Sequence, residues 1–128
     1  MHYSISIFGG WSSLERLYPD LPYDAKQTFT GSSLYFARSL FGYYGRCVDV
    51  SASNFGIRFR VRTFPFGFGL RPIVIPWHQI EECQRARFGL VGEALRLRVH
   101  GWSRPIYIGR FLWKYGDVYA RLIEAWQT

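Results

Sequence analysis

The chain has 128 residues and a mass of 15.0 kDa, which is enough for one ordinary domain and too little for two. Hydrophobic residues make up 48% of it and charged residues 20%, which excludes wholesale disorder, and no stretch reaches the roughly 18 unbroken apolar residues of a membrane span. Lysine and arginine outnumber acidic residues 16 to 9, giving a net charge of +7, while two cysteines are too few for a disulfide scaffold or a closed zinc site.

The positive charge is almost entirely arginine, because only Lys26 and Lys114 are lysines, and 20% of the residues are aromatic. Arginine forms paired bonds to phosphates and carboxylates and stacks on rings, so this composition suits nucleic acid, an anionic lipid surface or another protein as the partner. It equally suits a β-rich domain that fills its core with rings. Residues 1–8 lack the basic start of a secretory signal. We therefore expect a cytoplasmic protein, with peripheral contact at the inner face of the membrane as an extension of that prediction.

The first predicted element is a short helix. Residues 12–15 have the pattern of a capping box, in which Ser12 accepts a bond from the backbone of Glu15. Its apolar face comprises Trp11, Leu14, Leu17 and Tyr18. Pro19 and Pro22 end it after about two turns, so we expect it to cover one end of a core. The predicted organisation is an N-terminal segment over residues 1–25 and a domain over residues 26–128.

Seven short strands are predicted next. They span residues 33–38, 46–52, 55–62, 73–77, 81–88, 93–100 and 106–108. In the clearest one, Ile57, Phe59 and Val61 alternate with arginines, as expected of a half-buried strand. Residues 63–72 cannot form a regular strand because they contain two prolines and two glycines, and Pro76 suggests that its strand lies at an edge or ends there.

From Phe111 the apolar period changes to that of a helix. The apolar stripe comprises Leu112, Tyr115, Val118, Tyr119, Leu122, Ile123 and Trp126. Gly116 falls inside this predicted helix, which it would weaken by about 1 kcal/mol relative to alanine. A meander of seven strands curls to hide its edges, so we expect a mainly β (α+β) fold: an antiparallel sandwich or split barrel capped by the C-terminal helix.

This layout resembles the pleckstrin-homology-like (PH-like) fold. The segment Ile75-Pro76-Trp77-His78-Gln79-Ile80-Glu81 is similar to the I-P-W-x-x-I turn of bacterial domains with that fold. Residues 10–15 (GWSSLE), followed by Tyr18-Pro19, are similar to the G-W-x-x-L opening of a family of small uncharacterised bacterial proteins. The resemblance covers residues 10–126. It implies a scaffold that binds lipid headgroups, peptides or other proteins, and it implies no catalytic residues.

If that fold is correct, three loops, 38–46, 63–72 and 100–105, gather at the open end of the sandwich. The residues predicted to bind there are Arg38, Tyr43, Tyr44, Arg46, Phe64, Phe66, Phe68, Arg71, Trp102 and Arg104. Rings beside arginines suit an anionic membrane interface, and they also suit an acidic protein partner. The alternative is that the three phenylalanines fold back onto the core.

A second candidate surface lies on the predicted hairpin of residues 81–100. It comprises Arg85, Arg87, Arg96 and Arg98. A turn at 89–92 would place Arg85 opposite Arg96 with all four arginines on one face, where like charges would favour a bound anion. This predicts a nucleic-acid face as the second hypothesis for function, and a solvated sheet face as the structural alternative.

The sequence carries no recognisable catalytic pattern. His2, His78 and His100 are far apart and lack the spacing of a zinc protease, and Glu81 and Glu82 would point to opposite faces of a strand. Cys47 and Cys83 fall in strand patterns, where each is expected to be a small buried side chain. We therefore expect a non-catalytic binding module without a metal or cofactor, with an enzyme as the third hypothesis. A chain this rich in rings could also carry a face for a second copy of itself.

Overall fold

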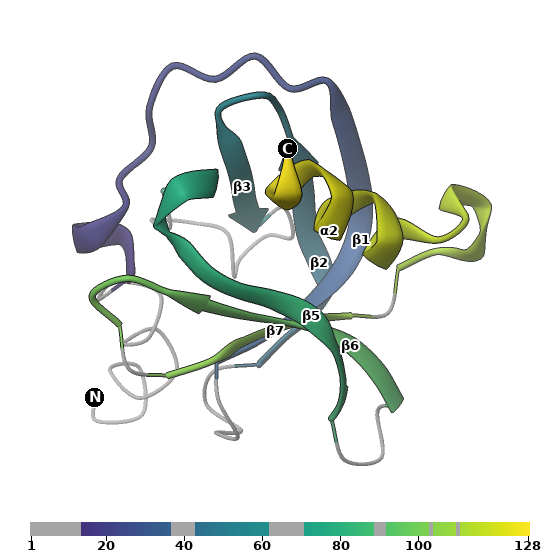
Figure 1. The fold of residues 1–128 in the computed structure, drawn as a ribbon. Coiled ribbons are helices and arrows are strands. Elements are labelled where there is room, and N and C mark those ends of the chain that lie inside the picture. Colours follow the sequence, from purple (N-terminus) through teal and green to yellow (C-terminus); the bar gives the residue numbers. More distant parts are fainter. Residues whose placement is uncertain (1–13, 37–42, 62–70, 89–91, 103, 110) are drawn as a thin grey trace, which may run out of the picture.

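The computed structural model describes residues 14–36, 43–61, 71–88, 92–102, 104–109 and 111–128 (Figure 1). Its strands are β1 (Gln27–Phe36), β2 (Tyr43–Ala52), β3 (Gly56–Val61), β4 (Ile73–Pro76), β5 (Ile80–Phe88), β6 (Gly92–Val99) and β7 (Ile106–Gly109). They form one antiparallel sheet in the order β4-β3-β2-β1-β7-β6-β5, which curls into a half-barrel. The predicted mainly β class is confirmed, together with a C-terminal helix and a short N-terminal one.

Strand β1 joins the two parts of the half-barrel. Its first residue, Gln27, lies opposite Ala52 of β2, whereas Phe36 at its other end lies opposite Ile106 of β7. The register with β2 is irregular on both sides of Ser32, whose side chain is fully buried. Irregular pairing of this kind bends a strand, and here it allows β1 to contribute to both parts of the sheet.

The predicted alternation is confirmed where the side chains are described. On β3, Ile57 and Phe59 are fully buried whereas Arg60 is exposed. On β6, the predicted inward residues Leu95, Leu97 and Val99 are all buried. These side chains line the concave face of the sheet, so the core lies inside the half-barrel.

Edge strand β4 presents prolines along its outer side. The Trp77 N–H donates to the Phe55 carbonyl over 3.1 Å, and this pair continues the β3–β4 register in which Gly56 lies opposite Pro76. Bonded pairs alternate in an antiparallel ladder, so Ile73 and Ile75 direct their backbone groups toward β3. The outward positions are therefore Pro72, Val74 and Pro76, and the predicted edge position of Pro76 is confirmed.

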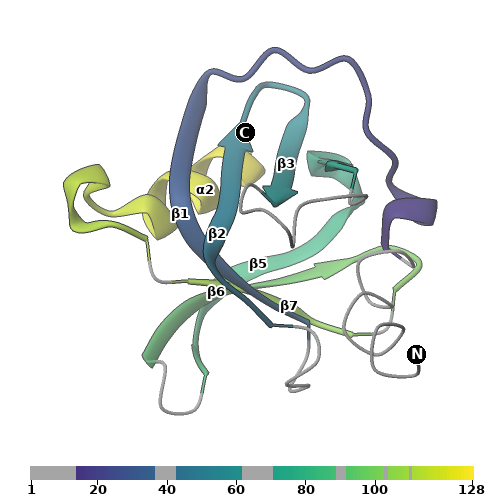
Figure 2. The same cartoon turned by 180° about the vertical axis from the view of Figure 1, so that it is seen from behind.

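The C-terminal helix α2 (Val118–Gln127) begins later than predicted. Gly116 has a φ of 73°, which ends the 3₁₀ turn η4 (Trp113–Tyr115), and Asp117 caps α2 by accepting a bond of 3.2 Å from the Ala120 N–H. The prediction that Gly116 lies inside the helix was wrong, because its left-handed conformation separates the two helical pieces. Val118 and Leu122 are buried as α2 lies across the mouth of the half-barrel (Figure 2).

Residues 14–26 form a strap that arches from the short helix past the β2–β3 turn, at one end of the sheet, before entering β1 (Figure 2). Leu14 is fully buried and Tyr18 nearly so, but Leu17 is 47% exposed. The predicted apolar face was therefore wrong for Leu17: the described helix, residues 14–17, is one turn long, and the i, i+4 pair Leu14 and Tyr18 supplies its contact with the core. Further along the strap, Asp20 pairs with Arg58 over 3.2 Å, which fixes it against β3.

Candidate functional site

An apolar groove lies between the strap and the corner where β4 leads into β5. We call it the strap groove; its volume is about 510 Å³. It is lined by Leu17, Tyr18, Pro19, Leu21, Val74, Pro76, Gln79, His100 and Gly101. Leu17 and Leu21 are 47% and 41% exposed, which is unusual for large aliphatic side chains that line the same groove.

Two features of the chain hold the strap groove open. The Tyr18 hydroxyl donates to the His100 carbonyl, so the strap is tied to the end of β6. Gly101 follows with a φ of 87°, and a Cβ there would lie 3.7 Å from the methyl groups of Leu17. The left-handed turn at Gly101 thus brings backbone, rather than a side chain, against Leu17.

A second groove lies on the other side of the same corner. We call it the tryptophan groove; its volume is about 430 Å³, and it is lined by Trp77, His78, Ile80, Trp126, Gln127 and Thr128. Both indole N–H groups are already bonded: Trp77 Nε1 donates to the Ser53 carbonyl over 2.7 Å, and Trp126 Nε1 donates to the Ile80 carbonyl over 2.8 Å. With their polar atoms satisfied, the two rings contribute apolar surface to this groove.

The 3₁₀ turn η2 (Trp77–Gln79) separates the two grooves. Pro76 and Gln79 line the strap groove, while Trp77 and His78 line the tryptophan groove. Phe55, which is 46% exposed, lies opposite Trp77 through the backbone bond described above. All three exposed large hydrophobic side chains of the described chain therefore border the segment 73–79. The sequence did not predict this surface.

The predicted basic face does not form. In the observed register Gln84 lies opposite Arg96, and Arg85 lies opposite Leu95, one residue away from the prediction. A slip of one residue moves a side chain to the other face of a sheet. Arg85 and Arg87 therefore lie on the concave side, and Arg96 and Arg98 lie on the convex side.

On the convex side, Glu82 pairs with two arginines. Its Oε1 lies 3.1 Å from Arg96 Nε and 3.2 Å from Arg98 Nε. Glu82 was not predicted to belong to this surface, although its position in β5 opposite Arg98 explains its role. Because these guanidinium groups already have a carboxylate partner, the convex face has less charge to offer a phosphate backbone than the sequence indicated.

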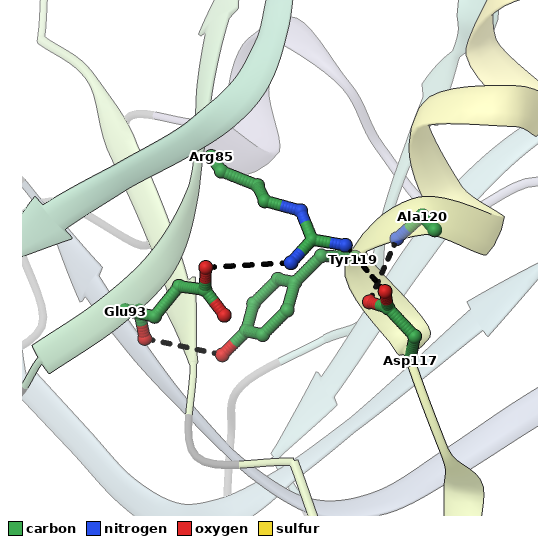
Figure 3. Close-up of polar contacts among 5 residues, drawn as sticks. All are labelled: Arg85, Glu93, Asp117, Tyr119 and Ala120. Carbon is green, nitrogen blue, oxygen red and sulfur yellow. Dashed lines mark hydrogen bonds and ion pairs between the residues drawn. The ribbon is translucent and has the colours of Figure 1, made fainter.

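Arg85 instead links the β5–β6 hairpin to the start of α2 (Figure 3). We call this cluster of Arg85, Glu93, Asp117 and Tyr119 the latch. The Arg85 guanidinium pairs with Glu93 over 3.3 Å and with Asp117 over 2.5 Å, and it lies 5.6 Å from the centre of the Tyr119 ring. The Tyr119 hydroxyl donates to the Glu93 carbonyl over 3.1 Å. The hydrogen bonds from Arg85 and from the Ala120 N–H lower the pKa of Asp117, and the bond to Asp117 raises the pKa of Arg85. The latch thus orients α2 and is not a vacant binding site.

Replacing Asp117 tests the latch and the helix cap separately. We expect Asp117→Ala to lower the melting temperature more than Asp117→Asn, because asparagine still caps a helix but carries no charge. The native pKa of Asp117 is depressed, so its charge stabilises the fold above the unfolded pKa near 4 and ceases to do so as pH falls through the native pKa. Thermal denaturation at pH 7 in low and high salt measures the contribution of the charge. The difference in melting temperature between wild type and Asp117→Asn should shrink in high salt, which screens the ion pair. Equal melting temperatures for the two variants would contradict the capping role.

The structure describes only part of the predicted loop-end site. Arg38, Phe64, Phe66 and Phe68 lie outside the described residues. Tyr43, Tyr44 and Arg46 are placed through their backbone in β2. Arg71 and Arg104 are exposed, whereas Trp102 is half-buried and packs against the core. Phe36 lies opposite Ile106, so the end of β1 and the start of β7 lie side by side. The binding role of this end remains a prediction.

The described residues contain no group of three His, Cys, Asp or Glu side chains that could hold a metal ion. Glu81 and Glu82 have different partners, since Glu81 pairs with His100 over 3.3 Å. Cys83 is buried as predicted, and burial raises its pKa to about 12, so the thiol is protonated and unreactive near neutral pH. Cys47 lies in β2. No helix in the described part of the chain is long and apolar enough to cross a membrane.

Comparison with known proteins supports the architecture. No family model and no curated protein matches the chain. Among solved structures it is similar to the crystal structure of the C-terminal domain of an unknown protein from Leishmania infantum, with a TM-score of 0.59, 11% sequence identity and coverage of 94% of each chain. At that identity the likeness concerns the fold alone, which it supports over nearly the whole length of both chains.

Proposed function

We propose that the chain is a non-catalytic, PH-like module that binds another protein through the apolar surface around η2. The PH-like assignment is supported by the order of elements, seven antiparallel strands followed by a helix across the mouth of the half-barrel. It is also supported by the position of the I-P-W-x-x-I residues, which turn the chain from β4 into β5. The binding site is the surface formed by the strap groove, η2 and the tryptophan groove.

The observation that carries this proposal is the clustering of exposed apolar side chains. Leu17 and Leu21 line the strap groove, and Phe55 lies beside Trp77. Apolar side chains that remain exposed and contiguous favour association, because burial against a partner removes them from water at about 25 cal/mol per Å². Tryptophan and other large rings at the centre of such a surface are the residues that most often dominate protein–protein affinity.

The charge of the chain indicates an acidic partner. Arg16, Arg60, Arg87 and Arg104 are exposed, and none of them forms an ion pair with the residues the structure describes. With a net charge of +7, the chain attracts an acidic protein over long range and repels a second copy of itself. Nearer the strap groove, Asp20 is paired with Arg58 and Glu81 shares a hydrogen bond with His100, while the groove itself is lined mainly by apolar side chains, so apolar contacts dominate the affinity there.

Displayed random peptides test the proposal without a known partner. We expect selection on the full-length chain to yield peptides that contain apolar and acidic residues and that lose about tenfold or more in affinity for Leu17→Ser or Leu21→Ser. Leu17→Met and Leu21→Met are the matched controls, because they keep an apolar side chain of similar volume and should bind within about twofold. Affinity is measured by isothermal titration or fluorescence anisotropy.

The outcomes separate the competing functions. Failure to select any peptide that depends on Leu17 or Leu21 would overturn the proposal. Light scattering that shows a dimer abolished by Leu21→Ser would identify a second copy as the occupant. Sedimentation with anionic vesicles, insensitive to both leucine variants, would instead support the membrane function predicted for the arginine-rich loops.

A further inference from the structure

We infer that the surface around η2 is bipartite: one partner segment crosses η2 and places one apolar side chain in the strap groove and a second in the tryptophan groove. This inference rests on the proposed function, and it adds the shape and chemistry of the partner. The recognised segment is an extended, acidic stretch of polypeptide with two apolar anchors.

The first argument is that the two grooves share a wall. Consecutive residues of one segment line opposite sides: Pro76 and Gln79 contact the strap groove, and Trp77 and His78 contact the tryptophan groove. The wall is a single 3₁₀ turn of three residues, about 6 Å long. A partner that covers either groove therefore reaches the rim of the other within a few residues.

The second argument is that η2 is rigidly held. Its first residue, Trp77, is fixed on one side by its backbone bond to Phe55 and by the indole bond to Ser53. At the other end, the His100 N–H donates to the Gln79 carbonyl over 2.9 Å. A wall anchored at both ends keeps the two grooves at a constant separation, so the spacing of anchors in a partner is selected by the protein.

The third argument concerns the chemistry of each groove. The strap groove presents aliphatic side chains and prolines, which suit a branched apolar side chain. The tryptophan groove presents two indole rings whose N–H groups are internally bonded, which suits an aromatic or proline side chain that packs on rings. With volumes of about 430 and 510 Å³, both grooves have room for a large side chain together with flanking backbone.

These dimensions predict the partner sequence. A segment that crosses one helical turn, about 10–12 Å wide with its side chains, and enters a groove on each side needs anchors three or four residues apart in extended chain. We expect a branched apolar residue and an aromatic residue or proline at that spacing, with acidic residues beside them that respond to the positive charge of the chain.

A double-mutant cycle between protein and peptide tests the inference. The probe is a selected peptide from the displayed library, in which each apolar anchor is replaced by alanine in turn. We expect each replacement to cost about tenfold in affinity for the wild-type chain. One replacement should cost almost nothing further in Leu21→Ser, because that pair removes the same contact. The other should cost less in Trp77→Phe than in the wild type, because the smaller phenylalanine ring keeps only part of the contact.

Two further variants keep the result interpretable. His78→Ala changes only an exposed residue of the tryptophan groove, so it remains informative even if Trp77→Phe destabilises the fold. We expect it to lower the affinity for the peptide that retains its aromatic anchor by a few-fold. Arg60→Ala, an exposed arginine on β3, serves as the control for general loss of positive charge. Inserting two glycines between the two anchors of the peptide should reduce its affinity to that of a peptide with a single anchor.

Different results would contradict the proposed function and the bipartite inference. If peptides depend on Leu17 and Leu21 but neither Trp77→Phe nor His78→Ala affects them, the bipartite inference is overturned and the proposed function survives. If both anchors couple to the same groove, the inference is likewise overturned. If no peptide depends on the leucines, both proposals are wrong.

Discussion

Alanine at Gly56 is expected to remove a large part of the free energy of unfolding. Gly56 is buried, and a Cβ built on it would lie 2.2 Å from the Ile75 carbonyl oxygen and 2.8 Å from Pro76 Cα. Both are backbone atoms of the neighbouring strand, so no side-chain rotation relieves the clash. Separating β3 from β4 is the remaining response, and we expect it to cost about 3 kcal/mol or more out of a typical stability of 5–15 kcal/mol.

Gly109→Ala is the matched control for Gly56→Ala. A Cβ at Gly109 would make ordinary contacts, the nearest at 3.5 Å from the Glu93 carbonyl and 3.6 Å from Ala94 Cβ. Its backbone also lies in strand β7, where alanine is tolerated, so the change in unfolding free energy should stay within about 1 kcal/mol. Urea denaturation of both variants measures the difference, and equal stability of the two would refute the close approach of β3 and β4.

Leu122→Ala is expected to lower the free energy of unfolding by about 3 kcal/mol. Leu122 is 1% exposed and lies in the apolar cluster beneath α2, and truncation of a buried leucine typically costs 2–5 kcal/mol through lost burial and a residual cavity. Arg121→Ala, at the adjacent exposed position, should change stability by no more than about 0.5 kcal/mol.

The shape of the Leu122→Ala transition carries a second test. Because α2 covers the same cluster that β3 and β6 line, the variant should unfold in one cooperative step at lower urea concentration. A separate early transition, in which the helical circular dichroism and the fluorescence of Trp126 change before the strands unfold, would show that α2 is an appendage rather than part of the core.

The strands were predictable where neighbouring residues alternate in polarity. Residues 57–62 and 95–100 alternate strictly, and the structure contains β3 and β6 there. The start of β1 was missed because residues 27–30 (QTFT) do not alternate clearly; their strand depends on pairing with β2, which lies far along the chain. The start of α2 was missed because the apolar period continues through Gly116, while a single left-handed residue breaks the helix.

The candidate site could not be derived from sequence patterns for a different reason. The strap groove joins Leu17, Val74 and Gly101, which are separated by long stretches of chain and meet only in the folded molecule. The basic face was predicted from a turn position that was wrong by one residue, and that error reassigned two arginines to the opposite face. An error of one residue in a predicted turn shifts every cross-strand pair of the hairpin that the turn connects.

The prolines on β4 limit how any partner can be recognised. Of the outward positions 72, 74 and 76, only Val74 has an N–H group, because Pro72 and Pro76 have none. An incoming polypeptide would therefore find a single backbone donor along this border, which disfavours its addition as an eighth strand, and the same holds for the β4 of another molecule. Selectivity at this corner must consequently be read from the partner's side chains, and a partner with a scrambled order of the same residues should be rejected.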